Sequence, residues 1–201
     1  ALVAIVIVFL GYLGYTKYIS EPNEIEASNE LAFPRKFYEQ ASTAGSGIDS
    51  LLTLGLEGAD GKYGFIDIAK SYSGTNAGNL SNYYAGVSYL EMKQYDKAIE
   101  YLENFNSNDE MLGPVTLGAV GDAFADINQP KEALEYYVKA ASKKDNNFTT
   151  PLFLYKAGLT AMELKKFDKA ASLFTKIKEN YPTSDQGRDV AKFINAAKYA
   201  E

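Results

Sequence analysis

Very few side chains of this sequence could take part in covalent chemistry. The chain has 201 residues and contains neither histidine nor cysteine. Ser-His-Asp triads, cysteine nucleophiles, thiol redox sites and zinc sites built on those ligands are therefore excluded by composition. An acid pair or a metal site made of carboxylates alone stays possible, and no pattern in the sequence favours either. We therefore expect no enzymatic activity and no cofactor.

Two short segments contain residues that such chemistry would use. The glycine-rich segment 58–64 contains Lys62, but its spacing differs from that of a phosphate-binding P-loop, and Tyr63 stands where that loop has Ser or Thr. Asp109 and Glu110 could form half of an acid pair, yet they lie in a polar turn just before an expected helix. Acidic side chains at that place favour a helix N-terminus. We interpret the first segment as a flexible inter-helix loop and the second as a helix cap.

Composition also limits the class of partner. The net charge is −6, and no cluster of Lys and Arg is longer than two residues. A protein that binds nucleic acid normally has a basic face that neutralises phosphates, so nucleic acid is not an expected partner. Hydrophobic residues make up 46% of the chain, which includes 16 tyrosines. Tyrosine supplies large amphipathic area, which suits both helix packing and a protein-binding groove.

The chain begins with an apolar run. The first ten residues contain no polar side chain, and Lys17 is the first charge. A helix of about fifteen residues rises about 22 Å, which is shorter than a hydrocarbon core of about 30 Å. We therefore interpret the run as part of a transmembrane helix that begins before Ala1. The residues expected to anchor the chain are Ala1, Leu2, Val3, Ile5, Ile7, Phe9, Leu10 and Leu13.

The residues after this run bear on two alternatives, a signal peptide and a buried globular helix, and on the orientation in the membrane. A signal peptide would need a small-residue cleavage site, whereas the run is followed by aromatic residues such as Tyr12 and Tyr15, which are typical of a membrane interface. A buried globular helix would need polar residues on one face. Lys17 is the only basic residue of the flank before Arg35. A basic segment before Ala1 would place the rest of the chain outside the cytoplasm, which in bacteria is the periplasm.

A repeat of about 35 residues is the strongest pattern in the chain. Three glycines recur at intervals of 35 and 37 residues, and three alanines recur at the same intervals. A glycine inside a helix costs about 1 kcal/mol relative to alanine, so three at matching positions indicate places where paired helices approach closely. We expect backbone-to-backbone contact at Gly86, Ala98, Gly121, Ala133, Gly158 and Ala170.

The repeated segment, residues 79–183, resembles the tetratricopeptide repeat (TPR) family. The resemblance implies an all-α fold, a TPR superhelix of helix-turn-helix repeats that follows a single transmembrane helix. We expect the transmembrane helix in residues 1–19, a degenerate first repeat with a glycine-rich insertion in 20–78, three TPR repeats in 79–183 and a capping helix in 184–201. Phe105 and Ile177 depart from the family, which has a small residue there, and should alter the angles between repeats.

Finer expectations concern both ends of the repeats. Residues 24–44 should form a helix that Pro34 kinks or begins. Residues 63–72 should form its partner, with a partly helical insertion, 44–62, between them. Apolar residues at helical spacing should cover the end of the stack, and these are Val190, Phe193, Ile194, Ala197 and Tyr199.

TPR arrays bind peptides on a concave groove lined by the first helix of each repeat. The expected groove residues are Leu80, Tyr83, Val87 and Leu90, then Val115, Gly118, Asp122 and Ala125, then Leu152, Tyr155, Leu159 and Met162. This set contains no basic residue, so capture of a C-terminal carboxylate is not expected. An extended apolar segment or a partner helix fits better. The alternative is that the C-terminal helix of the chain partly fills the groove.

A single membrane anchor followed by an acidic TPR domain resembles the YfgM-like ancillary subunits of the bacterial SecYEG translocon. That resemblance rests on the apolar start, the segment Asn82–Gly86 and the three repeats. It implies a single-pass protein of the inner membrane whose TPR domain lies in the periplasm. The implied partners are the translocon, a PpiD-like membrane-anchored isomerase chaperone and emerging secretory clients. The alternative is a TPR scaffold of another cell-envelope assembly.

Overall fold

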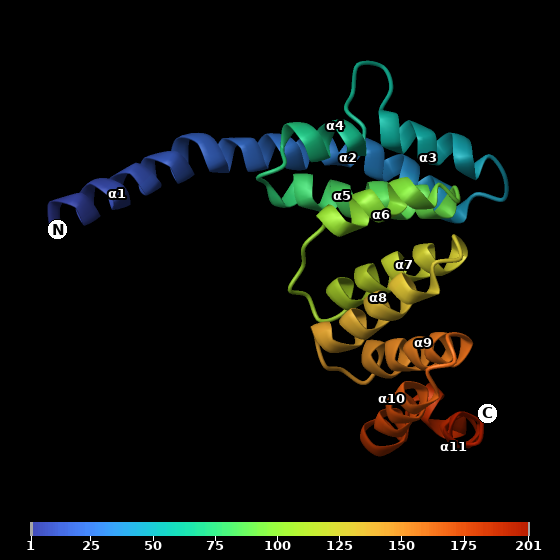
Figure 1. Ribbon diagram of the computed structural model, residues 1–201. Coiled ribbons are helices and arrows are strands. Elements are labelled where there is room, and N and C mark those ends of the chain that lie inside the picture. The colour runs from blue at the N-terminus through green and yellow to red at the C-terminus, as the bar shows by residue number, and fades with distance from the viewer. Residues whose placement is uncertain (1, 201) are drawn as a thin grey trace. The chain divides into compact units, whose positions relative to one another are not determined.

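The computed structural model describes residues 2–200 and confirms the all-α class. Apart from one isolated β-bridge between Ala59 and Lys62, the regular structure of those residues is helical (Figure 1). The elements in chain order are α1 Leu2–Tyr15, the π-helical turn η1 Thr16–Ser20, α2 Glu21–Thr43, α3 Ile48–Glu57, α4 Phe65–Ser71, α5 Asn76–Glu91, α6 Tyr95–Asn104, α7 Leu112–Asp126, α8 Pro130–Lys143, α9 Thr149–Glu163, α10 Phe167–Asn180 and α11 Asp185–Lys198. These elements form two compact units that divide after Met92.

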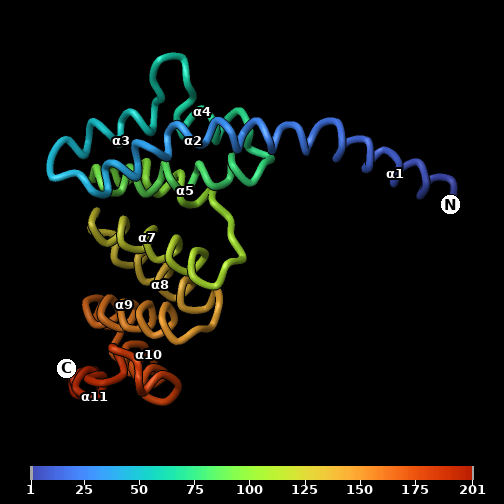
Figure 2. The backbone as a smooth tube through the Cα atoms, turned by 180° about the vertical axis from the view of Figure 1, so that it is seen from behind, coloured from blue at the N-terminus to red at the C-terminus, as the bar shows by residue number. Residues whose placement is uncertain are grey.

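The first unit begins with one uninterrupted helical rod. Figure 2 shows α1, η1 and α2 as a continuous coil, so no helix ends at the boundary expected near residue 19. The π-turn η1 closes with a hydrogen bond from the Glu21 N–H to the Thr16 carbonyl. Pro22 follows at the start of α2, where its missing N–H would interrupt an ordinary α-helical ladder. The apolar run is therefore joined directly to the first helix of the unit.

Pro34 lies inside α2 and does not begin it, contrary to one expected role. The proline is buried, and α3 packs against α2 beside it. A Cβ built on Gly55 of α3 would lie 3.3 Å from the Pro34 carbonyl oxygen. Backbone-to-backbone contact between paired helices therefore occurs here, within the segment expected to be an insertion.

The rest of the first unit packs around aromatic rings. Phe65 of α4 is fully buried and stacks on Tyr84 of α5, with ring centroids 5.0 Å apart. Tyr38 of α2 meets the same Tyr84 ring edge to face, also at 5.0 Å. Leu52 and Leu56 of α3 are buried as well. The segment 44–62 thus contributes core side chains, because its helix covers α2.

The glycine-rich connection between α3 and α4 forms a compact turn. Asp60 and Gly61 have positive φ angles of 54° and 73°. A Cβ on Gly58 would lie 2.1 Å from the Lys62 carbonyl oxygen, and no side chain can be accommodated at that distance. Close backbone contacts therefore define the turn within the segment expected to be a flexible loop.

The second unit contains α6 to α11, packed in chain order from α6 against α7 through to α10 against α11. Its core joins residues of α8 to α11. Val190, Ile194 and Ala197 of α11 are buried against this core, as expected of a capping helix. Tyr199 is 83% exposed, contrary to expectation, because it follows the last helical residue, Lys198.

The repeated glycines of this unit make room for rings. A Cβ on Gly121 would lie 2.7 Å from the Tyr137 ring, and one on Gly158 would lie 2.5 Å from the Phe174 ring. At both glycines an aromatic side chain of the next helix occupies the space. The Cβ on Gly121 would also lie 3.4 Å from the Ala133 carbonyl oxygen, so the expected close approach to the backbone occurs there. Gly86 is buried, and Ala98, Ala133 and Ala170 are fully buried.

The helix α6 is shorter than its counterparts. It has 10 residues, whereas α8 and α10 have 14 each. Phe105 follows its last residue in an extended conformation, with φ −82° and ψ 133°. Ala140, the matching small residue of α8, stays helical and fully buried, and so does Ile177 of α10. Of the two departures from the family pattern, the one at Phe105 therefore coincides with a helix end.

Candidate functional site: an apolar cavity and a polar cluster at the groove positions

The groove positions of α5 open onto a cavity in the first unit. Val87, Leu90 and Glu91 of α5 line a space of about 390 Å³ together with residues of α2 and α3. The opposite wall includes Tyr38, which is half-buried, and Leu52, which is buried. Glu91 is the one formally charged residue among the lining residues, and it is exposed. This cavity can accept an apolar side chain beside a carboxylate.

The tyrosines around this cavity keep their protons. Burial raises the pKa of the Tyr38 hydroxyl, and neighbouring tyrosines and Glu91 raise it further. Burial also raises the pKa of Tyr83, whose ring lies 5.7 Å from that of Tyr84. These hydroxyls therefore remain hydrogen-bond donors over the physiological pH range. Leu80, the fourth position expected on α5, is half-buried.

In the second unit the expected groove residue Asp122 belongs to a polar cluster. Its carboxylate accepts a hydrogen bond of 2.6 Å from the Tyr137 hydroxyl. The Lys156 ammonium donates to both carboxylate oxygens, at 2.7 and 2.8 Å, and lies 5.5 Å from the centre of the Tyr137 ring. Burial and, to a lesser extent, Asp122 raise the pKa of Tyr137. The cluster satisfies a buried hydroxyl and ties α7, α8 and α9 together.

Sequence reasoning missed Lys156, which brings a positive charge to the groove positions. Asp122 and Lys156 are separated by 34 residues, the length of one TPR repeat. Asn146 reaches the Glu110 carbonyl oxygen at 3.0 Å across 36 residues in the same way. A search for complementary charged residues one repeat apart would have found Asp122 and Lys156, whereas Asn146 binds a backbone oxygen that no residue type marks.

The remaining groove positions of the second unit differ in exposure, since Val115, Ala125 and Leu159 are exposed, whereas the other four are half-buried or buried. The Tyr155 ring meets Phe193 of α11 edge to face, with centroids 5.1 Å apart. The Phe153 ring lies over Gly118, where a Cβ would be 2.0 Å from it. Leu152 and Met162 pack against the core cluster, whereas Leu159 is 39% exposed. This arrangement favours the alternative in which the C-terminal helix partly fills the groove.

The expected helix cap before α7 is confirmed. The Asp109 carboxylate accepts hydrogen bonds from the backbone N–H groups of Leu112, at 2.7 Å, and Met111, at 2.9 Å. These bonds lower the pKa of Asp109, that of Leu112 contributing most. Among the described residues no group of three or more acidic side chains is placed to hold a metal ion.

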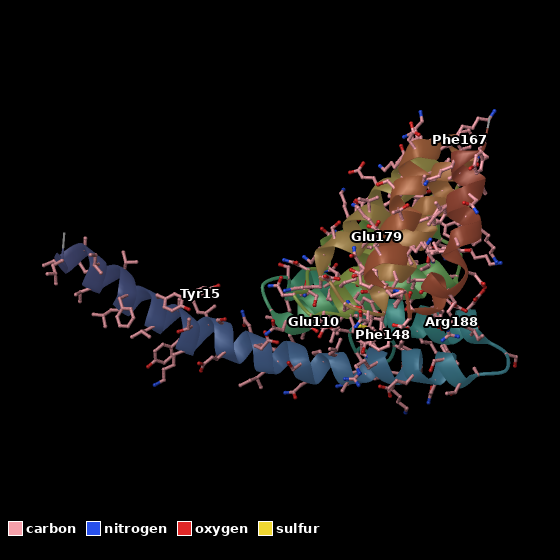
Figure 3. The ribbon with its side chains drawn as sticks, turned by 90° about the horizontal axis from the view of Figure 1, so that it is seen from below. Tyr15, Glu110, Phe148, Phe167, Glu179 and Arg188 are labelled. Carbon is pink, nitrogen blue, oxygen red and sulfur yellow. The ribbon has the colours of Figure 1, made fainter. Side chains whose placement is uncertain are left out.

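The expected membrane residues from Leu2 to Leu13 are all exposed, and Ala1 lies outside the described residues. Figure 3 shows Tyr15 on the same stretch of helix, from which side chains point outward on every side. The helix Leu2–Thr43 is long and apolar enough to cross a membrane, and its most apolar window is 0% buried. The ability of this helix to cross a membrane follows from its length and composition, which a signal sequence near an N-terminus shares.

Comparison with known proteins identifies the repeats. Residues 81–109 and 153–184 match the tetratricopeptide repeat family. No curated protein matches the chain. The first match covers most of α5 and all of α6, and the second runs from α9 to the turn before α11. The chain therefore carries tetratricopeptide repeats within an all-α fold, and such repeats form protein-interaction modules.

Proposed function

We propose that this chain is a protein-binding module held at a membrane by α1. The cavity beside Val87 and Leu90 is the observation that carries the binding role, since it lies at the groove positions that TPR arrays use for peptides. The exposed apolar side chains of α1 support the anchor. Because α1 continues into α2, which lines the same cavity, the anchor and the binding site belong to one helical unit.

The finer role that we propose is that of an ancillary subunit of the SecYEG translocon. In this role the repeats lie in the periplasm and pass emerging secretory chains to a PpiD-like membrane-anchored chaperone. A single anchor, the TPR repeats and an apolar cavity at the groove positions support it. No covalent chemistry is part of the proposed mechanism.

The cavity suits weak and reversible capture. Full burial of one leucine-sized side chain contributes about 1.5–3 kcal/mol, which by itself gives low affinity. A nascent segment would place one apolar side chain between α2, α3 and α5, beside the Tyr38 hydroxyl and Glu91. Release then needs no large barrier, as transfer to a second protein requires.

Photocrosslinking in cells tests both levels of the proposal. A photoreactive phenylalanine replaces Val87, which lines the cavity, and in a matched control it replaces Tyr199, which is exposed outside it. Tyr155 is a poor reporter, because Phe193 covers its ring. We expect adducts with secretory chains and with translocon subunits from position 87 alone.

The outcomes separate the two levels. Equal adducts from both positions, or none from position 87, would reject the binding role. Adducts from position 87 with other envelope proteins, and none with the translocon, would keep the binding role and favour a scaffold of another assembly.

Orientation has its own test, since the chain contains no cysteine. A single cysteine in place of Glu179, which is exposed on α10 (Figure 3), provides one labelling site. We expect a membrane-impermeant maleimide to label it in cells whose outer membrane alone has been permeabilised. Labelling only after the inner membrane is broken would reject a periplasmic location.

A further inference from the structure

The early end of α6 leaves a cavity between α6, α7 and α8. This space has a volume of about 530 Å³, and Leu102, Leu117 and Val120 form its apolar part. Phe105 lines it where a fuller helix would have continued, as α8 does through Ala140. The cavity thus occupies the place of about one missing helical turn.

Basic side chains border this cavity along α8. Lys139 and Lys143 both line it, one helical turn apart. The Lys139 ammonium pairs with Glu135 at 2.7 Å and lies 4.5 Å from the centre of the Tyr136 ring. The Lys143 stem lies against α7, since a Cβ on Gly113 would be 3.5 Å from its Cε. Lys143 is exposed, and so its charge is available to a ligand.

The acid of the same cavity already has a partner. Glu103 accepts a hydrogen bond from the Tyr136 hydroxyl. Burial, followed by Glu103, raises the pKa of Tyr136 to about 12, so this donor keeps its proton. With two lysines and one engaged carboxylate, the lining has a formal charge of +1 in a chain whose net charge is −6, and Glu135 beside it pairs with Lys139.

A second cavity borders α8 as well. It has a volume of about 320 Å³, with Leu134 and Val138 as its apolar residues. Its basic residues are Lys131, Lys139, Lys166 and Lys169, and its acidic residue is Glu135. Lys139 belongs to both cavities. The lysines of α8 at positions 131, 139 and 143 therefore form a basic ridge that borders both cavities, each of which also has apolar lining residues.

We propose that this basic ridge binds an acidic, apolar segment of a partner protein. Lys139 and Lys143 are about 6 Å apart along the helix axis, which matches two residues of an extended chain at about 3.3 Å each. The segment therefore carries two acidic residues separated by one residue, and its apolar residues lie two positions before the first acid and two after the second. Side chains at these positions share the face of the acids, so they can enter the cavities. A nucleic acid offers no apolar side chains for these cavities. This site is separate from the cavity beside Val87, and so it does not rest on the proposed function.

Selection from a displayed library of random octapeptides tests the proposal with the full chain in detergent. The variant Lys143→Glu reverses a charge that lines the cavity, and Lys144→Glu makes the same change at the next residue, which is exposed and lies outside the lining. We expect wild type and K144E to enrich peptides in which two acids are separated by one residue, with an apolar residue two positions before the first acid or two after the second. We expect K143E to bind the enriched peptides at least about tenfold more weakly, which corresponds to ~1.4 kcal/mol.

Several results would overturn the proposal. Enrichment of no such peptides by wild type, or equal enrichment by K143E, would be such a result. An equal loss in K144E would show a general charge effect without a site. If the library yields no acidic motif while the short-chain lipid dihexanoyl-phosphatidylglycerol protects Lys143 from acylation, the ligand is a lipid headgroup and the proposal is wrong. Circular dichroism of each variant shows that the helices are retained.

Discussion

Substitution of Gly158 by alanine should destabilise the second unit, although alanine is the better helix former. The new Cβ would lie 2.5 Å from a ring carbon of Phe174, which is fully buried. Helix propensity favours alanine by about 1 kcal/mol, whereas overpacking a core costs about 1–3 kcal/mol. We therefore expect a net loss of up to about 2 kcal/mol, measured as the shift in urea midpoint of the full chain in detergent.

A double-mutant cycle identifies the clash as the cause. Phe174→Leu removes the ring from the contact while leaving an apolar side chain. In that background Gly158→Ala should cost less or become favourable, with a coupling of about 0.5–3 kcal/mol. Ala191→Gly, at an exposed site of α11, measures the propensity difference without a packing change. A free energy of unfolding about 1 kcal/mol higher for G158A alone than for wild type, with the two substitutions additive, would refute this reasoning. The Phe174 ring would then not clash with a side chain at position 158.

Three further predictions concern polar contacts. Asp122→Ala should cost about 1–3 kcal/mol in urea unfolding, because it leaves the Tyr137 hydroxyl buried without its acceptor; a loss no larger than that of an exposed substitution would contradict this. Asp109 has a lowered pKa, so its contribution to stability is full above its ordinary value of 3.8 and disappears as pH falls through the lower folded value. Acid titration followed by NMR should place its midpoint below 3.8, and Asp109→Asn should remove that part of the pH dependence; a midpoint at 3.8 or above would argue against the cap. Tyr136, with a pKa of about 12, should ionise well above the ordinary value of 10 in absorbance titrations at alkaline pH. The contribution of Tyr136 to stability is full below pH 10 and is lost as pH rises through 12. Glu103→Gln should lower the midpoint, whereas an unchanged midpoint would show that Glu103 does not raise this pKa.

Local patterns were sufficient to predict the helices and the repeat. Periodic apolar residues and repeated small residues act within one helix or one helix pair, so they can be read without knowing distant contacts. The helical part expected within residues 44–62 is α3, Ile48–Glu57, and the cap at Asp109 is also found. The position of Pro34 within its helix was harder to predict from the sequence. A proline usually marks the start or a break of a helix, whereas here Pro34 lies inside α2, which packs against α3.

The candidate sites could be predicted less well than the helices, because they depend on contacts of the tertiary structure. The groove positions follow from the repeat, but the side chains that cover them do not. Phe193 reaches Tyr155 from another helix, and Lys156 reaches Asp122 from the next repeat. These contacts join residues at least 34 positions apart, so single-helix periodicity contains no record of them.

The sequence by itself determined an all-α chain with an apolar start, tetratricopeptide repeats and no histidine or cysteine for catalysis. The tertiary structure decided what the repeated glycines contact, where α6 ends and which surfaces remain open as cavities. The reason is physical: helix formation follows from hydrogen bonds between residues four apart, whereas a cavity depends on the volumes of side chains that meet from separate helices.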